Sequence, residues 1–316
     1  MRTQSWILNL VAAVIATSTI FIVSAKERDT LITNVVRINV SVIDGDNRPI
    51  PGLAKEDFAI FEDNVAQEIV FWTHDDSSLG FSLAFDISDY EPLKLMARQV
   101  ARSFVGQIRL ADEVTIPQLK ADSLAVLGFA VDERSLENAL VETPSNDKLV
   151  GLVDDAIKST IKSRRSRSSA VVVITDGRSL SGTASDRDVA NAIFRRGTPI
   201  YFIILDDGRY MARSAVQSRL RRTRGLLTRL AAASGGLALV VKSEDEISAA
   251  IEQIIHRLQN QYTMGYAPIS EKFDGSFRYI RVSVTPKDNR KVRVFAPTGY
   301  YTVDPEKIRE EMTNDK

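Results

Sequence analysis

Two short segments of this sequence each place an acidic side chain directly after a run of apolar residues. Residues 80–86 are mostly apolar and end at Asp86, and Ser88 follows two positions later. Residues 170–174 are apolar throughout and are followed closely by Asp176. Short apolar runs of this kind are typical of parallel strands that are buried on both faces. Because ligands bind at the carboxyl edge of an open α/β sheet, both acidic groups are expected to face one site that suits a hard cation such as Mg²⁺.

Strands and helices alternate around these two segments. The apolar patterns predict strands at 80–86, 112–116, 122–129, 169–175, 199–205 and 237–241, and helices at 92–108, 133–141, 148–162, 186–196, within 212–233 and at 244–260. Strands that are separated by helices of this length predict an α/β fold, a doubly wound and mostly parallel sheet with helices on both faces. We assign this domain to residues 79–260.

Both flanks of the α/β segment have the pattern of short strands. Residues 34–75 form an N-terminal β segment, residues 261–303 form a C-terminal β segment, and residues 304–316 are a polar tail. Neither flank contains enough apolar residues to form a stable sheet alone. We therefore expect the two flanks to pack together into one small β module beside the α/β domain.

The first 25 residues resemble a targeting segment. Arg2 supplies positive charge, residues 6–23 are largely apolar, and Val23-Ser24-Ala25 offers a cleavage site with small residues. The apolar stretch fits a cleaved signal peptide, and it is also just long enough for a retained N-terminal membrane anchor. Both alternatives predict an exported protein, periplasmic or secreted. The chain has no cysteine, which excludes disulfides and thiolate chemistry.

In their order and spacing, these features resemble the von Willebrand factor A (vWA) domain, and more closely the bacterial VWFA-related domain proteins with a β segment on each side of it. The resemblance covers roughly residues 34–303. The matching stretches are Gly52-Leu53, Glu56-Asp57-Phe58, Phe61-Glu62-Asp63, Gln67-Glu68-Ile69, Phe85-Asp86-Ile87-Ser88, Ile174-Thr175-Asp176-Gly177, Gln261–Tyr266, Phe277–Val282 and Gly299-Tyr300-Tyr301.

The resemblance implies a metal-ion-dependent adhesion site with Asp86, Ser88 and Asp176 as ligands of Mg²⁺ or another divalent cation. In such domains an acidic group of a protein partner completes the coordination of the ion. This chain departs from the family pattern because Tyr90 stands where a second serine is expected. Asp89 is an alternative ligand.

A second departure concerns the threonine-bearing loop of the family, which has no clear equivalent here. Gly151 falls near the threonine position, and Thr143 or Ser145 would serve only in a longer loop. The alternative is a degenerate site without metal, in which the two aspartates bind backbone N–H groups or the neighbouring Arg178.

Residues 158–229 are strongly basic, although the formal net charge of the chain is zero. Arg221, Arg222 and Arg224 belong to this segment, and residues 206–224 form an unusually long stretch that we interpret as an insertion that shapes a binding surface. A basic face of this kind predicts contact with an anionic surface or polymer, or with an acidic partner. The alternative is a set of solvated helix faces. Aromatic residues are sparse in the segment, so no nucleic acid partner is expected.

Catalytic motifs are absent from the sequence. His74 and His256 are the only histidines, and neither lies in a metal-ligand spacing or near a nucleophile motif. We therefore expect an exported, non-enzymatic protein-binding or adhesion module. The alternative is a metal-independent structural or assembly subunit at the cell envelope that binds through its basic face. A metal-dependent hydrolase is the least favoured class, because no general base is available beyond the proposed ligands.

Overall fold

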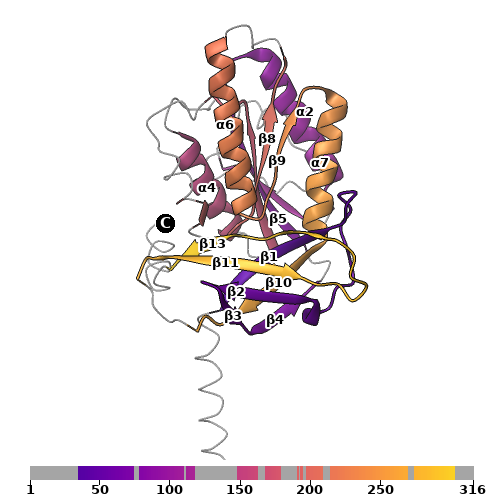
Figure 1. Cartoon of the computed structure of the whole chain (residues 1–316). Helices are drawn as coiled ribbons and strands as arrows, with labels where there is room; N and C mark the ends of the chain where they lie inside the picture. The colour runs from indigo at the N-terminus through magenta and orange to yellow at the C-terminus, as the bar shows by residue number, and fades with distance from the viewer. Residues whose placement is uncertain are drawn as a thin grey trace, which may run out of the picture.

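A computed structural model shows an α/β domain above a module of antiparallel strands (Figure 1). The structure describes residues 35–74, 78–109, 112–117, 148–162, 168–178, 191, 193–194, 197–208, 214–269 and 274–302. The targeting segment, the strand expected at 122–129, the helix expected at 133–141 and the polar tail lie outside these residues. No helix among the described residues is long and apolar enough to cross a membrane.

The α/β domain is built on a five-stranded sheet in the order β6-β5-β7-β8-β9, and all four pairings are parallel. This confirms the mostly parallel sheet that the sequence predicts. Its strands are β5 (Leu79–Asp86), β6 (Glu113–Thr115), β7 (Ser168–Thr175), β8 (Ile200–Leu205) and β9 (Ala238–Val241).

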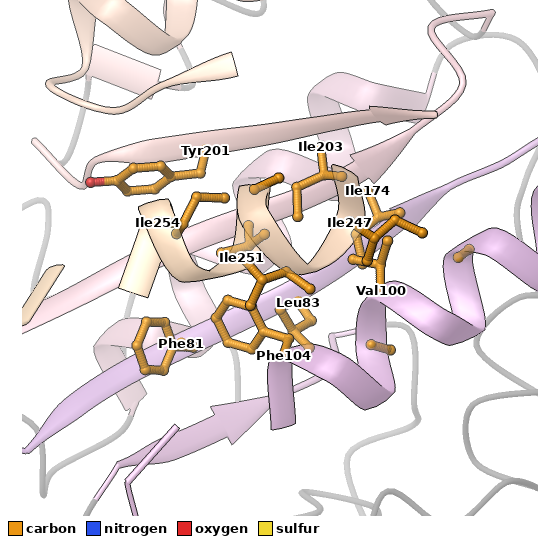
Figure 2. Packing of buried hydrophobic residues seen from close by; sticks show 14 of the residues in the cluster. Phe81, Leu83, Val100, Phe104, Ile174, Tyr201, Ile203, Ile247, Ile251 and Ile254 are labelled. Atoms are coloured by element: carbon orange, nitrogen blue, oxygen red, sulfur yellow. The ribbon is translucent and has the colours of Figure 1, made fainter. Parts of the chain in front are cut away.

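Helices cover both faces of the sheet, as expected. α2 (Glu91–Gln107) and α7 (Glu244–Gln259) pack on one face, and α4 (Lys148–Lys162) and α6 (Ser214–Ala233) pack on the other. Figure 2 shows the cluster between the sheet and the helices α2 and α7, where side chains from three neighbouring strands interleave with those of both helices. Alternate residues of each strand contribute to the two clusters, which explains the unbroken apolar runs in the sequence.

The interpretation of residues 206–224 as an insertion is wrong for the part after Ser214, because α6 begins there and continues through Gly225. Alanine, leucine, glutamine and arginine fill most of the helix, and these residues have high helix propensity. One glycine costs a helix only about 1 kcal/mol relative to alanine, which the packing of Leu227 and Leu230 on the sheet outweighs.

The strand order of the sheet has a topological switch point between β5 and β7. After β5 the chain forms β6 on one side, and it then returns to place β7 on the other side of β5. In register, Asp86 is opposite Thr175, so the ends of both strands lie at one edge. Open α/β sheets bind ligands at the carboxyl edge beside a reversal of this kind.

The β module consists of two four-stranded antiparallel sheets, ordered β12-β1-β10-β4 and β13-β11-β2-β3. β1 pairs with β10 and β12, and β2 pairs with β11, so each sheet combines strands from both flanks of the α/β domain. The elements are β1 (Val36–Ile43), the 3-10 helix η1 (Lys55–Asp57), β2 (Phe58–Glu62), β3 (Val65–Gln67), β4 (Ile69–Thr73), β10 (Gln261–Tyr266), β11 (Phe277–Val284), β12 (Arg293–Phe295) and β13 (Gly299–Tyr301).

Tyrosine hydroxyls join the strands inside this module. The carboxylate Oε2 of Glu62 accepts the hydroxyl of Tyr266 at 2.6 Å and that of Tyr300 at 3.0 Å. The hydroxyl of Tyr262 donates to the carbonyl oxygen of Ile50 at 2.7 Å and accepts the N–H of Leu53 at 3.1 Å. Burial is the main cause that raises the pKa of Tyr262. These rings therefore serve the packing of the module.

The module contacts the α/β domain through the turn that follows α6. The N–H of Thr298 donates to the carbonyl oxygen of Ala233 at 2.8 Å, and Ser234 forms an isolated bridge with Pro297. Gly235 has a φ of 85°, and a Cβ there would lie 3.1 Å from backbone atoms of residues 296 and 297. The turn must therefore be glycine-rich for the module to approach closely.

Substitution of Gly236 by alanine should destabilise the chain strongly, because a Cβ would lie 1.9 Å from the carbonyl oxygen of Ile200. Relief of this overlap requires movement of backbone, at a cost of about 3 kcal/mol. The matched variant Gly106→Ala in α2 has no atom within 4 Å of the new Cβ, and it should stabilise the chain by about 0.5–1 kcal/mol. Urea unfolding measures both, and equal midpoints for the two variants would contradict the packing described here.

Candidate functional site at the carboxyl edge of the sheet

Asp86 ends strand β5 at the carboxyl edge of the sheet and is only 6% exposed. Its Oδ2 accepts a hydrogen bond from the hydroxyl of Thr175 at 2.6 Å. The same hydroxyl accepts the N–H of Gly177 at 2.9 Å, so Thr175 joins the end of β5 to the loop after β7. Thr175 is fully buried, and the sequence analysis assigned no role to it, although it lies between the apolar run and Asp176.

Asp176 holds the loop after β5 against the loop after β7. Its backbone N–H donates to the carbonyl oxygen of Asp86 at 3.2 Å, which extends the pairing of the two strands by one residue. Its Oδ2 accepts the N–H of Ser88 at 3.1 Å, and its Oδ1 accepts the N–H of Arg178 at 3.1 Å. The two acidic groups that are 90 positions apart in sequence therefore belong to one network.

The guanidinium of Arg178 lies between the oxygens that the sequence analysis proposed as metal ligands. Its Nη1 donates to the hydroxyl oxygen of Ser88 at 3.3 Å, and its Nε lies 3.6 Å from Oδ2 of Asp176. The side chain of Asp176 is 3% exposed and that of Arg178 is 25% exposed. A buried carboxylate is thus balanced by a fixed positive charge that still reaches solvent.

This arrangement does not fit a divalent cation at Asp86, Ser88 and Asp176. Mg²⁺ needs oxygen ligands at about 2.1 Å in near-octahedral geometry, and two of the three proposed ligands are engaged by the guanidinium of Arg178. Among the described residues, no three His, Cys, Asp or Glu side chains form a group that could hold a metal. The contacts of Asp176 are those of the degenerate alternative, backbone N–H groups and Arg178, whereas Asp86 accepts the hydroxyl of Thr175.

Asp89 and Tyr90 lie at the start of α2, where one forms an ion pair and the other packs against the core. Asp89 is exposed and forms an ion pair with Nζ of Lys94 at 2.5 Å, and this hydrogen bond lowers the pKa of the Asp89 carboxyl. Tyr90 is the N-cap residue of α2, and its half-buried side chain packs against the apolar cluster of α2 and α7. Its ring therefore contributes to the core.

A third strand of the sheet is also followed by acidic residues at this edge, which the sequence did not single out as site residues. Asp206 and Asp207 follow strand β8, and Asp206 forms an ion pair with Arg224 of α6 at 2.9 Å. A shallow pocket at this edge is lined by Leu93, Asp176, Arg178, Leu205, Asp206, Asp207, Leu220 and Arg224. The rule that identified Asp86 and Asp176, an acidic residue at the end of an apolar strand, would also have found Asp206.

The other residues that the sequence suggested for binding lie at different places in the structure. Arg224 lines the pocket, whereas Arg221 and Arg222 are exposed on α6. Gly151, near the position of the family's threonine, lies within α4. Thr143 and Ser145 lie outside the described residues.

Comparison with solved structures finds several weak similarities. The chain is similar to proximal thread matrix protein 1 of the mussel byssus (TM-score 0.40, 12% identity, 62% of this chain and 49% of that chain). It is also similar to the PilB minor pilin of Streptococcus sanguinis (TM-score 0.36, 10% identity, 59% and 62%) and to the manganese-loaded TRAP protein of Plasmodium vivax (TM-score 0.36, 12% identity, 76% and 97%). The chain spans about half the length of the mussel protein chain that it matches.

No protein-family model matches the chain, and no curated protein matches it in sequence. The TM-scores of these matches lie below 0.5. The assignment to an open, doubly wound α/β architecture therefore rests on the strand order and the helix layers of this chain itself.

Substitution of Thr175 by valine should destabilise the edge, since it removes the hydroxyl that joins Asp86 to Gly177. Valine has nearly the same shape as threonine, so the expected loss of about 1–3 kcal/mol reports the two hydrogen bonds that the hydroxyl makes. Thr175→Ser keeps the hydroxyl and loses only a methyl group, and it should cost about 1 kcal/mol. Urea unfolding of the full chain compares the variants, and a serine variant that is less stable than the valine variant would contradict this role.

Proposed function

We propose that this chain is an exported, non-enzymatic protein-binding module of the vWA-like class. Its binding surface is the carboxyl edge of the parallel sheet, at the ends of β5 and β7. In this proposal the edge works without a metal ion, because the guanidinium of Arg178 supplies the positive charge that a cation supplies in related domains. An acidic side chain of the partner would contact this guanidinium.

The observation that carries the proposal is the position of Arg178 at the strand-order reversal. Its side chain is bound to Ser88 and Asp176 from two different loops, and a quarter of it remains exposed. A guanidinium that is held by two loops loses little further freedom when it binds a carboxylate, and guanidinium–carboxylate pairs are strong charge-assisted contacts. The adjacent pocket offers the apolar surface of Leu93, Leu205 and Leu220 beside these charges.

The positions of the two histidines support the non-enzymatic part of the proposal. His74 stacks on Tyr262 in the β module at a ring-centroid distance of 4.4 Å, and His256 lies on the surface of α7. Neither belongs to the edge, where the titratable side chains lining the pocket are Asp176, Arg178, Asp206, Asp207 and Arg224. The aspartates 176 and 206 are each paired with an arginine, which does not favour their use as general bases.

Charge reversal at Arg178 tests the proposal. The full chain without residues 1–25 is immobilised and exposed to an extract of the cells that produce it, in the presence of EDTA, and the captured proteins are quantified by mass spectrometry. At least one protein should bind the wild type and lose tenfold or more of its capture with Arg178→Glu. Arg281→Glu is the matched control, because it makes the same charge change on the exposed strand β11 and should retain the partner.

Two outcomes would overturn the proposal. One is the absence of any captured protein that depends on Arg178. The other is a partner whose capture requires added Mg²⁺ and disappears with EDTA, since the positive charge at the edge would then come from a metal ion. Circular dichroism of both variants establishes that each is folded.

A second candidate function is contact with an anionic surface through α6. The helix contains five arginines and no acidic residue over its 20 residues, and Arg221, Arg222 and Arg229 are exposed on it. The formal net charge of the whole chain is zero, so this helix concentrates positive charge on one part of the surface. Such a face attracts anionic lipid or an acidic polymer.

Reversal of two α6 charges tests this candidate. Vesicles of phosphatidylglycerol and phosphatidylcholine should bind the wild type at low salt, and Arg221→Glu/Arg222→Glu should weaken binding at least tenfold, because each basic residue contributes about 1 kcal/mol near such a surface. The control Arg281→Glu/Lys287→Glu makes the same change of net charge on the β module. Equal loss in both variants would mean that only net charge matters, and the α6 surface would not be a binding face.

A further inference from the structure

Arg257 is a buried cation at the junction between the α/β domain and the β module. It lies near the C-terminal end of α7 and is only 2% exposed. The carbon Cζ of its guanidinium lies 3.5 Å from the centre of the Phe295 ring, which belongs to strand β12 of the module. Its carbonyl oxygen is 3.5 Å from the hydroxyl of Ser41 in β1. The side chain is therefore enclosed by elements from both halves of the molecule.

Within the part of the chain that the structure describes, the guanidinium of Arg257 has no hydrogen-bond acceptor. Its three nitrogens Nε, Nη1 and Nη2 are buried without a partner among the residues that the structure describes. Arginine remains charged in proteins, and it carries five donor hydrogens. A buried charge without a counter-charge is strongly unfavourable, and stacking on one aromatic ring does not replace the lost hydration.

Two other buried side chains at this junction have the same incomplete hydrogen bonding. The hydroxyl of Tyr201 and Oε1 of Gln261 are buried without a partner of good geometry, and the two residues are 0% and 6% exposed. Figure 2 shows Tyr201 at one end of the apolar cluster, with its hydroxyl directed away from the other labelled side chains. Burial raises the pKa of Tyr201 to about 12, and the charge of Arg257 opposes this rise. Tyr201 is therefore a neutral donor beside the cation.

Among the described residues, no carboxylate is found among the groups that act on the charge of Arg257. The charged side chain that acts on Arg257 is Arg293 of β12, which is a second cation. A neutral water molecule would satisfy donors, but it would leave the positive charge unbalanced. The local chemistry therefore requires a negative charge that accepts hydrogen bonds from a guanidinium and from a phenol.

We propose that Arg257 and Tyr201 bind a small inorganic anion of the chloride class at this junction. The guanidinium and the Tyr201 hydroxyl donate to the anion, and Gln261 lies beside the Tyr201 hydroxyl. The ligand is small because all three side chains are almost completely buried. The anion links α7 and β8 to the β module, so its binding stabilises the attachment of the module. This site is separate from the carboxyl edge and does not depend on the proposed function.

Bromide, which replaces chloride and scatters anomalously, tests the site directly. Crystals of the chain grown in sodium bromide should show an anomalous peak within hydrogen-bond distance of the Arg257 guanidinium and the Tyr201 hydroxyl. In solution, the melting temperature of the chain should rise with chloride concentration when sodium gluconate keeps the ionic strength constant. A rise of about 3 °C for each tenfold increase above the dissociation constant is expected for one site that exists only in the folded state.

Two arginine variants separate a specific site from general salt effects. Arg257→Met should lose the chloride-dependent rise. Arg281→Met should retain the chloride-dependent rise, because Arg281 is exposed. Arg281 is a suitable control since it also stacks on an aromatic ring, with its Cζ 3.9 Å from the centre of the Phe61 ring. The proposal is overturned if bromide appears only at exposed arginines, as an adventitious ion only. It is equally overturned if the wild type shows no chloride dependence, or if Arg257→Met responds to chloride as the wild type does.

Discussion

The parallel register of β5 and β7 is the constraint on which the candidate site depends. Both strands are buried on both faces, so their side chains alternate between two apolar clusters that pack against different helices. A shift of one residue would exchange the faces of a whole strand and disrupt both clusters. The register that the core requires places Asp86 opposite Thr175 and brings Asp176 one residue beyond the paired strands. The position of the site is thus a consequence of core packing.

At this edge the buried carboxylates of Asp86 and Asp176 each have specific partners. Asp86 accepts the Thr175 hydroxyl, and Asp176 is balanced by Arg178 and by backbone N–H groups. A low-polarity environment makes such pairing necessary, because an unpaired buried carboxylate would lose its hydration without compensation. The opposite end of the sheet differs, since Arg257 is buried there with an aromatic ring and without an acceptor. At the carboxyl edge, the buried carboxylate is therefore balanced by an arginine of the chain itself. At the opposite end of the sheet, we infer that the buried guanidinium is balanced by a bound anion.

In the β module, the two segments that flank the α/β domain depend on each other for the burial of their apolar side chains. Ser41 pairs with Gln261, and the whole α/β domain lies between these two positions in sequence. The apolar cluster of the module includes residues from both flanks, so neither flank can bury its apolar side chains alone. Because long-range pairings of this kind carry a large loop-closure cost, we expect the α/β domain to form before the module closes around its ends.

The sequence by itself determined the local elements and the class of fold. Apolar runs, helical stripes and turn residues predicted the strands that end at Asp86 and before Asp176 and the helices that separate them, because side-chain periodicity and propensity are local properties. The tertiary structure decided what the charged groups do. The positions of Arg178 between Ser88 and Asp176, of Tyr90 against the core and of Arg257 beneath the sheet depend on which distant side chains meet them. Pairing and burial of charge are set by neighbours in space, and a one-dimensional pattern does not contain those neighbours.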